Sequence, residues 1–150
     1  MSLVLNTYVH LLFIIIIFCC LVAELLLINP SVSFNTIKRL SKIDGLYGLA
    51  AVVVVTTGLL NWFQYGKGYD YYTANLAFNL KFGLFILVGL LSIYPTIMFA
   101  KLKKRHKKDQ PKTLELSGYA LIRKTIIAEL IIMACIPFLA ELMANGLDIR

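Results

Sequence analysis

The stretch that decides the fold is VHLLFIIIIFCCLVAELLLIN, residues 9–29. It is apolar along its length except for two internal residues, His10 and Glu24. A helix needs about 20 predominantly apolar residues to cross roughly 30 Å of hydrocarbon. These residues therefore predict a transmembrane helix, and the rest of the chain can be judged by the same criterion.

Three further stretches meet that criterion: residues 46–63, 80–100 and 125–144. The first carries no charge, the second only Lys81 near its start, and the third Glu129 and Glu141. None of the stretches alternates in polarity as the strands of a membrane β-barrel do. The sequence predicts an all-α protein with a single transmembrane domain over residues 1–150, folded as an integral membrane four-helix bundle.

The composition excludes two other classes of protein. Hydrophobic residues make up 59% of the 150-residue chain and charged residues 15%, with a mean hydropathy of +0.79. Soluble domains have about 45–50% apolar and about 25% charged residues. An ordinary water-soluble domain is therefore excluded. A disordered chain is excluded as well, because disordered chains are poor in apolar residues.

Basic residues give the expected orientation in the membrane. The connections between the first and second and between the third and fourth predicted helices hold Lys38, Arg39, Lys42, Lys101, Lys103, Lys104, Arg105, Lys107, Lys108, Lys112, Arg123 and Lys124. The opposite side has only Lys67, Lys81 and Arg150. Because cytoplasmic loops carry the excess of Lys and Arg, we expect these two connections in the cytoplasm and both termini outside, in the periplasm of a Gram-negative cell. The expected location is the bacterial cytoplasmic (inner) membrane, with anionic lipid headgroups rather than nucleic acid against the basic loops.

Ionisable residues at membrane depth are costly, so they mark functional sites or face partners inside the bundle. The expected orientation places Glu24 and Glu129 at the cytoplasmic ends of their helices, near Arg39 and Arg123. These carboxylates are interpreted either as ion pairs with Arg39, Arg123 or the adjacent lysine, or as part of a proton path. Tyr47 begins a stripe of small and polar residues on the second helix, where another helix can approach closely.

A second layer of ionisable residues, His10, Lys81 and Glu141, lies at the outer ends of the helices. Lys81 forms either a simple pair with Glu141 or a positive site for an anionic ligand such as a propionate. His10 is either a haem or metal ligand or a hydrogen-bonding residue at a helix interface. The only other histidine, His106, lies in a basic connection. A haem on His10 would therefore have its other axial position open, or filled by water, Lys81, Met143 or the histidine of a second protomer.

Five short segments, spread over nearly the whole chain, carry a resemblance. They are YVHLL at 8–12, AELLL at 23–27, DGLYGLAA at 44–51, KFGLF at 81–85 with LSIYPT at 91–96, and AEL at 128–130 with Pro137. Together they resemble an uncharacterised family of bacterial four-helix inner-membrane proteins. That family is in turn similar to the HemJ-type protoporphyrinogen oxidases and the CopD-type copper-resistance membrane proteins.

The resemblance to the HemJ-type proteins implies haem b as a cofactor. By that similarity His10 matches a first-helix histidine that ligates the haem iron, and Lys81 matches a third-helix lysine with a catalytic or cofactor-binding role. The implied function is a haem-binding membrane protein with a redox role, in porphyrinogen oxidation or quinol-linked electron transfer, and any enzyme activity would be that of a haem-dependent oxidoreductase. Three alternatives stay open: a non-catalytic accessory or assembly protein that joins a partner subunit or a second copy, a small proton-coupled transporter, and a copper-handling protein.

Overall fold

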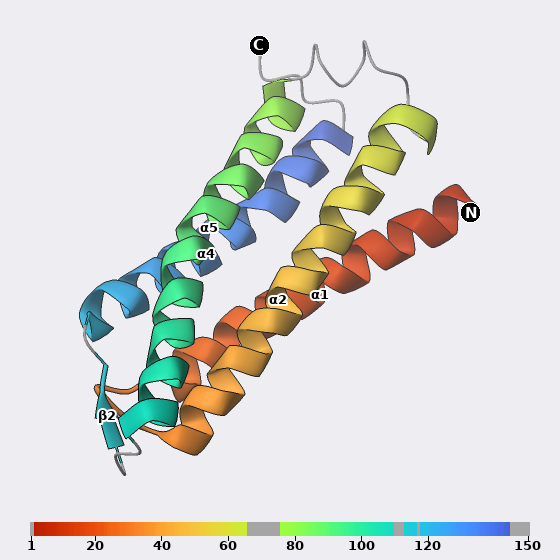
Figure 1. Ribbon diagram of the computed structural model, residues 1–150. Coiled ribbons are helices and arrows are strands. Elements are labelled where there is room, and N and C mark those ends of the chain that lie inside the picture. Colours follow the sequence, from red (N-terminus) through yellow and green to blue (C-terminus); the bar gives the residue numbers. More distant parts are fainter. Residues whose placement is uncertain (1, 66–75, 110–112, 117, 145–150) are drawn as a thin grey trace.

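The computed structural model describes residues 2–65, 76–109, 113–116 and 118–144, with side chains except at 65, 76–77, 106–109, 113–114 and 142–144. Figure 1 shows four long helices, which make up most of this chain: α1 Leu3–Leu27, α2 Phe34–Leu60, α4 Leu76–Asp109 and α5 Tyr119–Ala144. A short π-helix, η1 Asn61–Tyr65, continues directly from α2. The protein is thus helical, as the sequence predicts.

All four helices are longer than the apolar stretches that predict them. The second shows why, since it begins far ahead of the stretch 46–63. Ser33 caps it, with its Oγ accepting a hydrogen bond from the backbone N–H of Thr36 at 3.3 Å. The first turns then bury Ile37 and Leu40 completely. Hydropathy marks the part of a helix suited to the membrane, whereas capping and packing determine where the helix begins.

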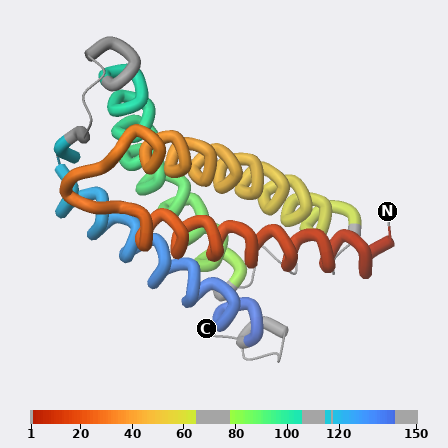
Figure 2. The backbone as a smooth tube through the Cα atoms, turned by 90° about the horizontal axis from the view of Figure 1, so that it is seen from below, coloured from red at the N-terminus to blue at the C-terminus, as the bar shows by residue number. Residues whose placement is uncertain are grey.

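The four helices pack around a common apolar core (Figures 1 and 2). α1 packs most extensively against α2, and α4 against α5, while contacts of α2 with α4 and of α1 with α5 join the two pairs. Every helix contributes fully buried side chains to the centre, among them Leu21, Leu40, Phe99 and Ile126. Residues far apart in the sequence are therefore brought together between the helices.

A small antiparallel sheet joins the α1–α2 connection to the α4–α5 connection. Its strands are β1 Ser31–Ser33 and β2 Thr113–Glu115, with Val32 opposite Leu114. The sequence does not predict this sheet, because three-residue strands are too short to show a polarity pattern. We call this end of the molecule the strand end, and the opposite end, where α2 passes into η1, the η1 end.

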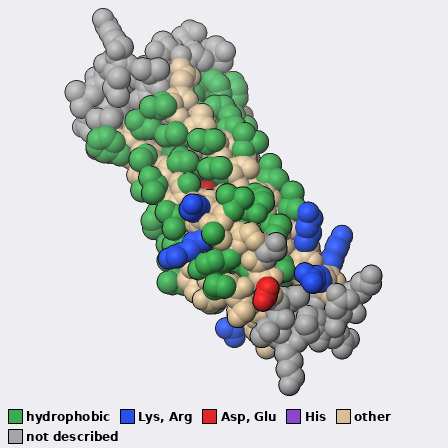
Figure 3. Space-filling view, turned by 90° about the vertical axis from the view of Figure 1, so that its left-hand side faces the viewer, with side chains coloured by type: hydrophobic (Ala, Val, Ile, Leu, Met, Phe, Trp, Pro, Cys, Tyr) green, Lys and Arg blue, Asp and Glu red, His purple; other side chains and the backbone are tan. Residues whose placement is uncertain are grey.

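The surface is that of a membrane protein. Three helical spans are long and apolar enough to cross a membrane: Leu3–Leu27, Phe34–Gln64 and Phe78–Arg105. α5 is not among them, and its described part carries Arg123, Lys124, Glu129 and Glu141. Large apolar side chains are exposed on every helix, for example 76% at Leu26 and 65% at Phe138. Figure 3 shows hydrophobic side chains over much of one face, with Lys and Arg gathered toward the strand end. A water-soluble protein rarely exposes so continuous an apolar surface.

Candidate functional site

α1 and α2 approach closely near the η1 end, where a glycine faces a histidine. A Cβ atom placed on Gly58 of α2 would lie 3.4 Å from Cε1 of His10 on α1. The His10 ring is half-buried, and its Nδ1 lies 2.8 Å from Oγ1 of Thr57. The hydroxyl of Thr57 thus holds the imidazole against α2, beside Gly58.

The hydrogen bonds of Thr57 determine the tautomer of His10. The Thr57 hydroxyl donates its single proton to the backbone carbonyls of Val53 at 2.7 Å and Val54 at 3.2 Å. It therefore accepts from His10, so Nδ1 carries a proton and Nε2 is the unprotonated nitrogen of the neutral ring. The ring also makes a hydrogen bond to the backbone of Val54. Metal-ligating histidines are typically held in this way, with the second nitrogen donating to an acceptor.

A fully buried asparagine, Asn6, lies one helical turn before His10. Its side-chain amide donates to the backbone carbonyl of Thr57 at 3.0 Å and to Oδ1 of Asn61 at 2.7 Å. Because Asn61 is the first residue of η1, Asn6 ties α1 to the point where α2 changes helix type. Our sequence interpretation missed Asn6, although a four-residue spacing places it on the same face of α1 as His10.

A cavity of about 370 Å³ lies between all four helices near the η1 end. His10 and Lys81 both line it, and most of the remaining wall is apolar. Trp62 forms part of this wall, with its ring centroid 5.1 Å from that of Phe78 and 6.1 Å from that of Phe82. The volume lies within the range of about 300–1,000 Å³ that is usual for small-molecule sites. The structure thus brings His10 and Lys81, from α1 and α4, to one cavity.

The ammonium group of Lys81 lies over an aromatic ring. Its Nζ is 5.0 Å from the centroid of Phe78, which makes a cation–π contact. Among the described side chains no ion pair joins Lys81 to Glu141, which has other interactions. The Lys81 charge is therefore available to an anion in the cavity. The side chains of Met143 and His106 lie outside the described residues.

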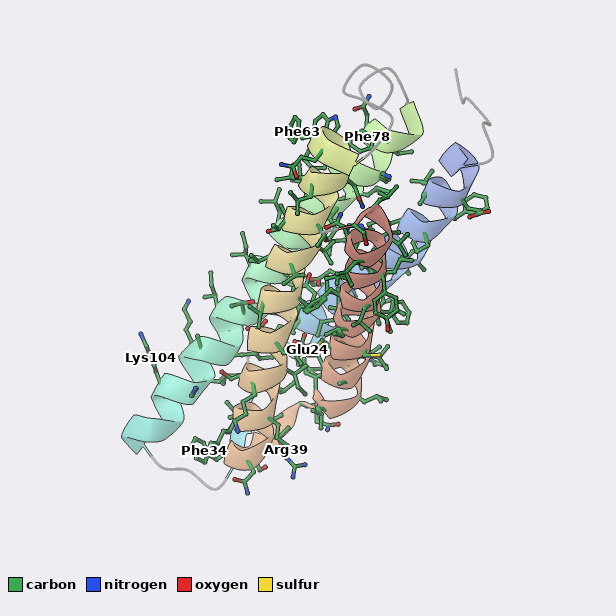
Figure 4. All side chains as sticks on the ribbon, turned by 90° about the vertical axis from the view of Figure 1, so that its right-hand side faces the viewer. Glu24, Phe34, Arg39, Phe63, Phe78 and Lys104 are labelled. Carbon is green, nitrogen blue, oxygen red and sulfur yellow. The ribbon has the colours of Figure 1, made fainter. Side chains whose placement is uncertain are left out.

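Nearer the strand end, two carboxylates are buried between the helices. Glu24 of α1 is 3% exposed and Glu129 of α5 is 1% exposed, and the hydroxyl of Tyr47 donates to Glu129 Oε2 at 3.4 Å. The expected ion pairs with Arg39 or Arg123 are not formed: both arginines are exposed, and in the described part of the chain neither is paired with a glutamate. Figure 4 shows Arg39 at the strand end, beyond Glu24. Long basic side chains at helix ends extend to water rather than into the core.

A third carboxylate, Asp44 of α2, lies in the same region. Its Oδ1 accepts a hydrogen bond from Thr96 of α4 at 2.7 Å, and it interacts electrostatically with both Glu24 and Glu129. Our sequence interpretation missed Asp44 because it precedes the apolar stretch of the second helix. Its position one turn before Tyr47 was the available signal.

A metal ion can also be held by several protein side chains without a haem. Within the described residues, no group of three or more His, Cys, Asp or Glu side chains is arranged to hold a metal ion. Structural zinc sites need four such ligands, whereas haem iron needs only one or two axial ligands from the protein. The candidate cofactor site therefore rests on His10 and its cavity.

The long apolar helices, the apolar surface and the ionisable groups between the helices define the class of the molecule, a helical integral membrane protein. The chain belongs to the family described as "Predicted membrane protein (DUF2214)", whose model matches residues 2–148. No curated protein and no solved structure matches the chain, so the comparisons give no match to HemJ-type or CopD-type proteins. The ligand of the cavity has to be argued from its geometry.

Proposed function

We propose that the protein is a haem-binding membrane protein with a redox role. The observation that carries the proposal is the state of His10. Thr57 holds its ring through Nδ1–H, and the ring lines a cavity with Nε2 unprotonated. Such a nitrogen is a suitable axial ligand for haem iron. The mostly apolar wall suits a hydrophobic macrocycle, and Lys81 supplies the positive charge that a propionate needs.

Each residue of the cavity has a definite part in this proposal. A bound haem b supplies one-electron transfer, and the protein positions and tunes it. His10 binds the iron, and Thr57 fixes the orientation of the imidazole. Lys81 would hold a propionate or the iron, and the aromatic wall around Trp62 would exclude water. A porphyrinogen or a quinol is the class of reductant proposed.

The same proposal includes an arrangement in the membrane. All four helices span the bilayer, and α5 is included because Ile131 and Phe138 expose large apolar side chains to the surroundings. The exposed basic residues at the strand end, among them Arg39 and Lys104, lie at the cytoplasmic headgroups (Figure 4). The η1 end and its cavity then face the outer side of a bacterial cytoplasmic membrane.

Absorption spectra of the purified protein, oxidised and dithionite-reduced, test the haem proposal. We expect a Soret band that sharpens on reduction, that is lost in His10→Ala, and that returns when imidazole is added to that variant. His106→Ala is the matched control, because it removes the only other histidine of the chain, and it should leave the band unchanged.

A featureless spectrum from folded protein, expressed with ample haem, would overturn the proposal. Equal loss of the band in His10→Ala and His106→Ala would overturn the assignment of the ligand. The featureless spectrum would favour a non-catalytic accessory protein, in which His10 and Thr57 only hold α1 against α2.

A further inference from the structure

The two buried glutamates leave part of their hydrogen-bonding capacity unused. Oε1 of Glu24 and Oε1 of Glu129 are both fully buried, and neither has a hydrogen-bond partner among the described residues. Buried polar side chains are nearly always hydrogen-bonded, so two such atoms in one region require an explanation. The explanation has to be a group that binds to carboxylate oxygens.

The groups that face Glu24 are acidic or neutral. Glu24 interacts electrostatically with two other carboxyl groups, those of Asp44 and Glu129. It also interacts with the thiol of Cys20 on its own helix and with the hydroxyl of Tyr47, which interacts with Glu129 as well. α4 contributes hydroxyl groups to this region, from Ser92 and Thr96. In the described part of the chain no lysine, arginine or histidine is ion-paired with either glutamate.

A pair of ionised carboxylates in such surroundings is strongly unfavourable. Each has lost its hydration, and each repels the other without a compensating positive charge. Buried carboxyl groups in this situation bind a proton and become neutral, and two neighbouring carboxyl groups share protons rather than ionise together. The buried, unpartnered oxygen atoms of Glu24 and Glu129 therefore favour a bound proton between α1 and α5.

We propose that Glu24, Glu129 and Asp44 form a proton-binding site, in which the buried glutamate pair holds at least one exchangeable proton in the folded protein. Asp44 is the entry to the site, because it is half-buried and its bond to Thr96 lies at the surface. The proton passes from water at the strand end to Asp44 and then to the glutamates, and it leaves by the same route. Buried exchangeable protons of this kind serve proton relays and proton-coupled transport. The proposal is independent of haem.

Infrared spectroscopy of the purified protein at pH 7, in H₂O and in D₂O, tests the site directly. A protonated carboxyl group gives a carbonyl band separate from those of carboxylates, and exchange with deuterium shifts it. We expect this band in the unaltered protein and its loss or weakening in Glu24→Gln and Glu129→Gln. Glutamine keeps the shape of the protonated acid, so both variants should fold.

Glu115→Gln is the matched control, since Glu115 is an exposed carboxylate at the same end of the molecule, and it should leave the band unchanged. His10→Ala should also keep the band, which separates this proposal from the haem proposal. Absence of the band in folded, unaltered protein would overturn the proposal. So would a melting temperature raised by Na⁺ but not by choline, if the glutamine variants abolished that rise, because the bound cation would then be a metal ion.

Discussion

Both ends of the molecule bury polar side chains between the helices, but these side chains have different partners at the two ends. At the η1 end, Asn6 and His10 each bond to Thr57, Oδ1 of Asn6 has no partner among the described residues, and the ring of His10 borders a cavity of about 370 Å³. Nearer the strand end, Glu24 and Glu129 are buried with oxygen atoms left unbonded among the described residues. Polar groups in a membrane protein are retained where they bind something. The cavity beside His10 suits a small-molecule ligand, whereas the buried glutamates suit a bound proton or metal ion.

The neighbours of the charged groups differ in the same way. Lys81 lies against the face of Phe78, and none of the described carboxylates forms an ion pair with it. The glutamates lie near Asp44, a further acidic group, and Glu129 accepts a hydrogen bond from the neutral hydroxyl of Tyr47. A change at one end should therefore alter ligand binding, and a change at the other should alter proton binding. The predictions below use this difference, from the largest expected effect to the smallest.

Thr57→Val should have the largest effect. Valine has nearly the same shape as threonine but leaves the Nδ1–H of His10 without an acceptor, which costs about 1–3 kcal/mol of unfolding free energy. Loss of such an outer-shell partner typically weakens ligation about 10–100-fold. Denaturant unfolding in detergent and titration with haem measure the two effects.

Thr56→Val is the control for this variant. Its hydroxyl donates only to the backbone carbonyl of Val52, at 2.8 Å and on the exposed side of α2. We expect a change in unfolding free energy within about 0.5 kcal/mol and unchanged haem binding. Equal effects of the two substitutions would show that the His10–Thr57 bond does not position the ligand.

If Glu24 and Glu129 hold a proton in the folded protein, its unfolding free energy should decrease as the pH rises. If the folded protein holds one proton more than the unfolded chain, the unfolding free energy falls by about 1.4 kcal/mol per pH unit. The fall begins above about pH 4.3, where an unfolded glutamate ionises, and it ends where the folded carboxyl pair ionises. The double variant Glu24→Gln/Glu129→Gln should show a flat profile, and His10→Ala should keep the slope. A slope that persists in the double variant would place the bound proton elsewhere.

Tyr47→Phe measures whether Glu129 is charged. The variant removes the hydroxyl that donates to Glu129 Oε2. A hydrogen bond to a neutral acid contributes about 0.5–1.5 kcal/mol, whereas one to an ionised carboxylate contributes about 1.5–3 kcal/mol. We expect the smaller loss of unfolding free energy, with no change in Tyr8→Phe, because Tyr8 is 63% exposed. A loss in the larger range would indicate an ionised Glu129.

The fold was predictable wherever it depends on hydropathy. The apolar stretches indicate the four helices, because the cost of unbonded backbone groups in hydrocarbon leaves helices as the simplest solution. The sheet of β1 and β2 was not predictable, because its three-residue pairing depends on contacts between connections far apart in the sequence. The start of α2 at Ser33 was visible only as a capping residue, a local signal that hydropathy does not contain.

The candidate site was predictable in its residue types but not in its partners. His10, Lys81, Glu24 and Glu129 stand out because ionisable residues are rare in apolar stretches. Their contacts depend on how the helices are rotated, which one sequence does not give. The expected pairs of the glutamates with arginines followed from sequence proximity, yet the packing buried the glutamates and left the arginines exposed.

The smallest expected effect comes from two glycines of α2. Replacing a glycine inside a helix by alanine stabilises the helix by about 0.5–1 kcal/mol. Gly48 has open space around its Cβ position, so Gly48→Ala should show the full gain. At Gly58 the new methyl group would lie 3.4 Å from Cε1 of His10, which is an ordinary van der Waals contact, so the ring can keep its bond to Thr57. Gly58→Ala should therefore show a similar gain, with haem binding unchanged. A smaller gain at Gly58 together with weaker haem binding would mean that the ring has no room beside α2, and the glycine would then be a feature of the site rather than of helix packing.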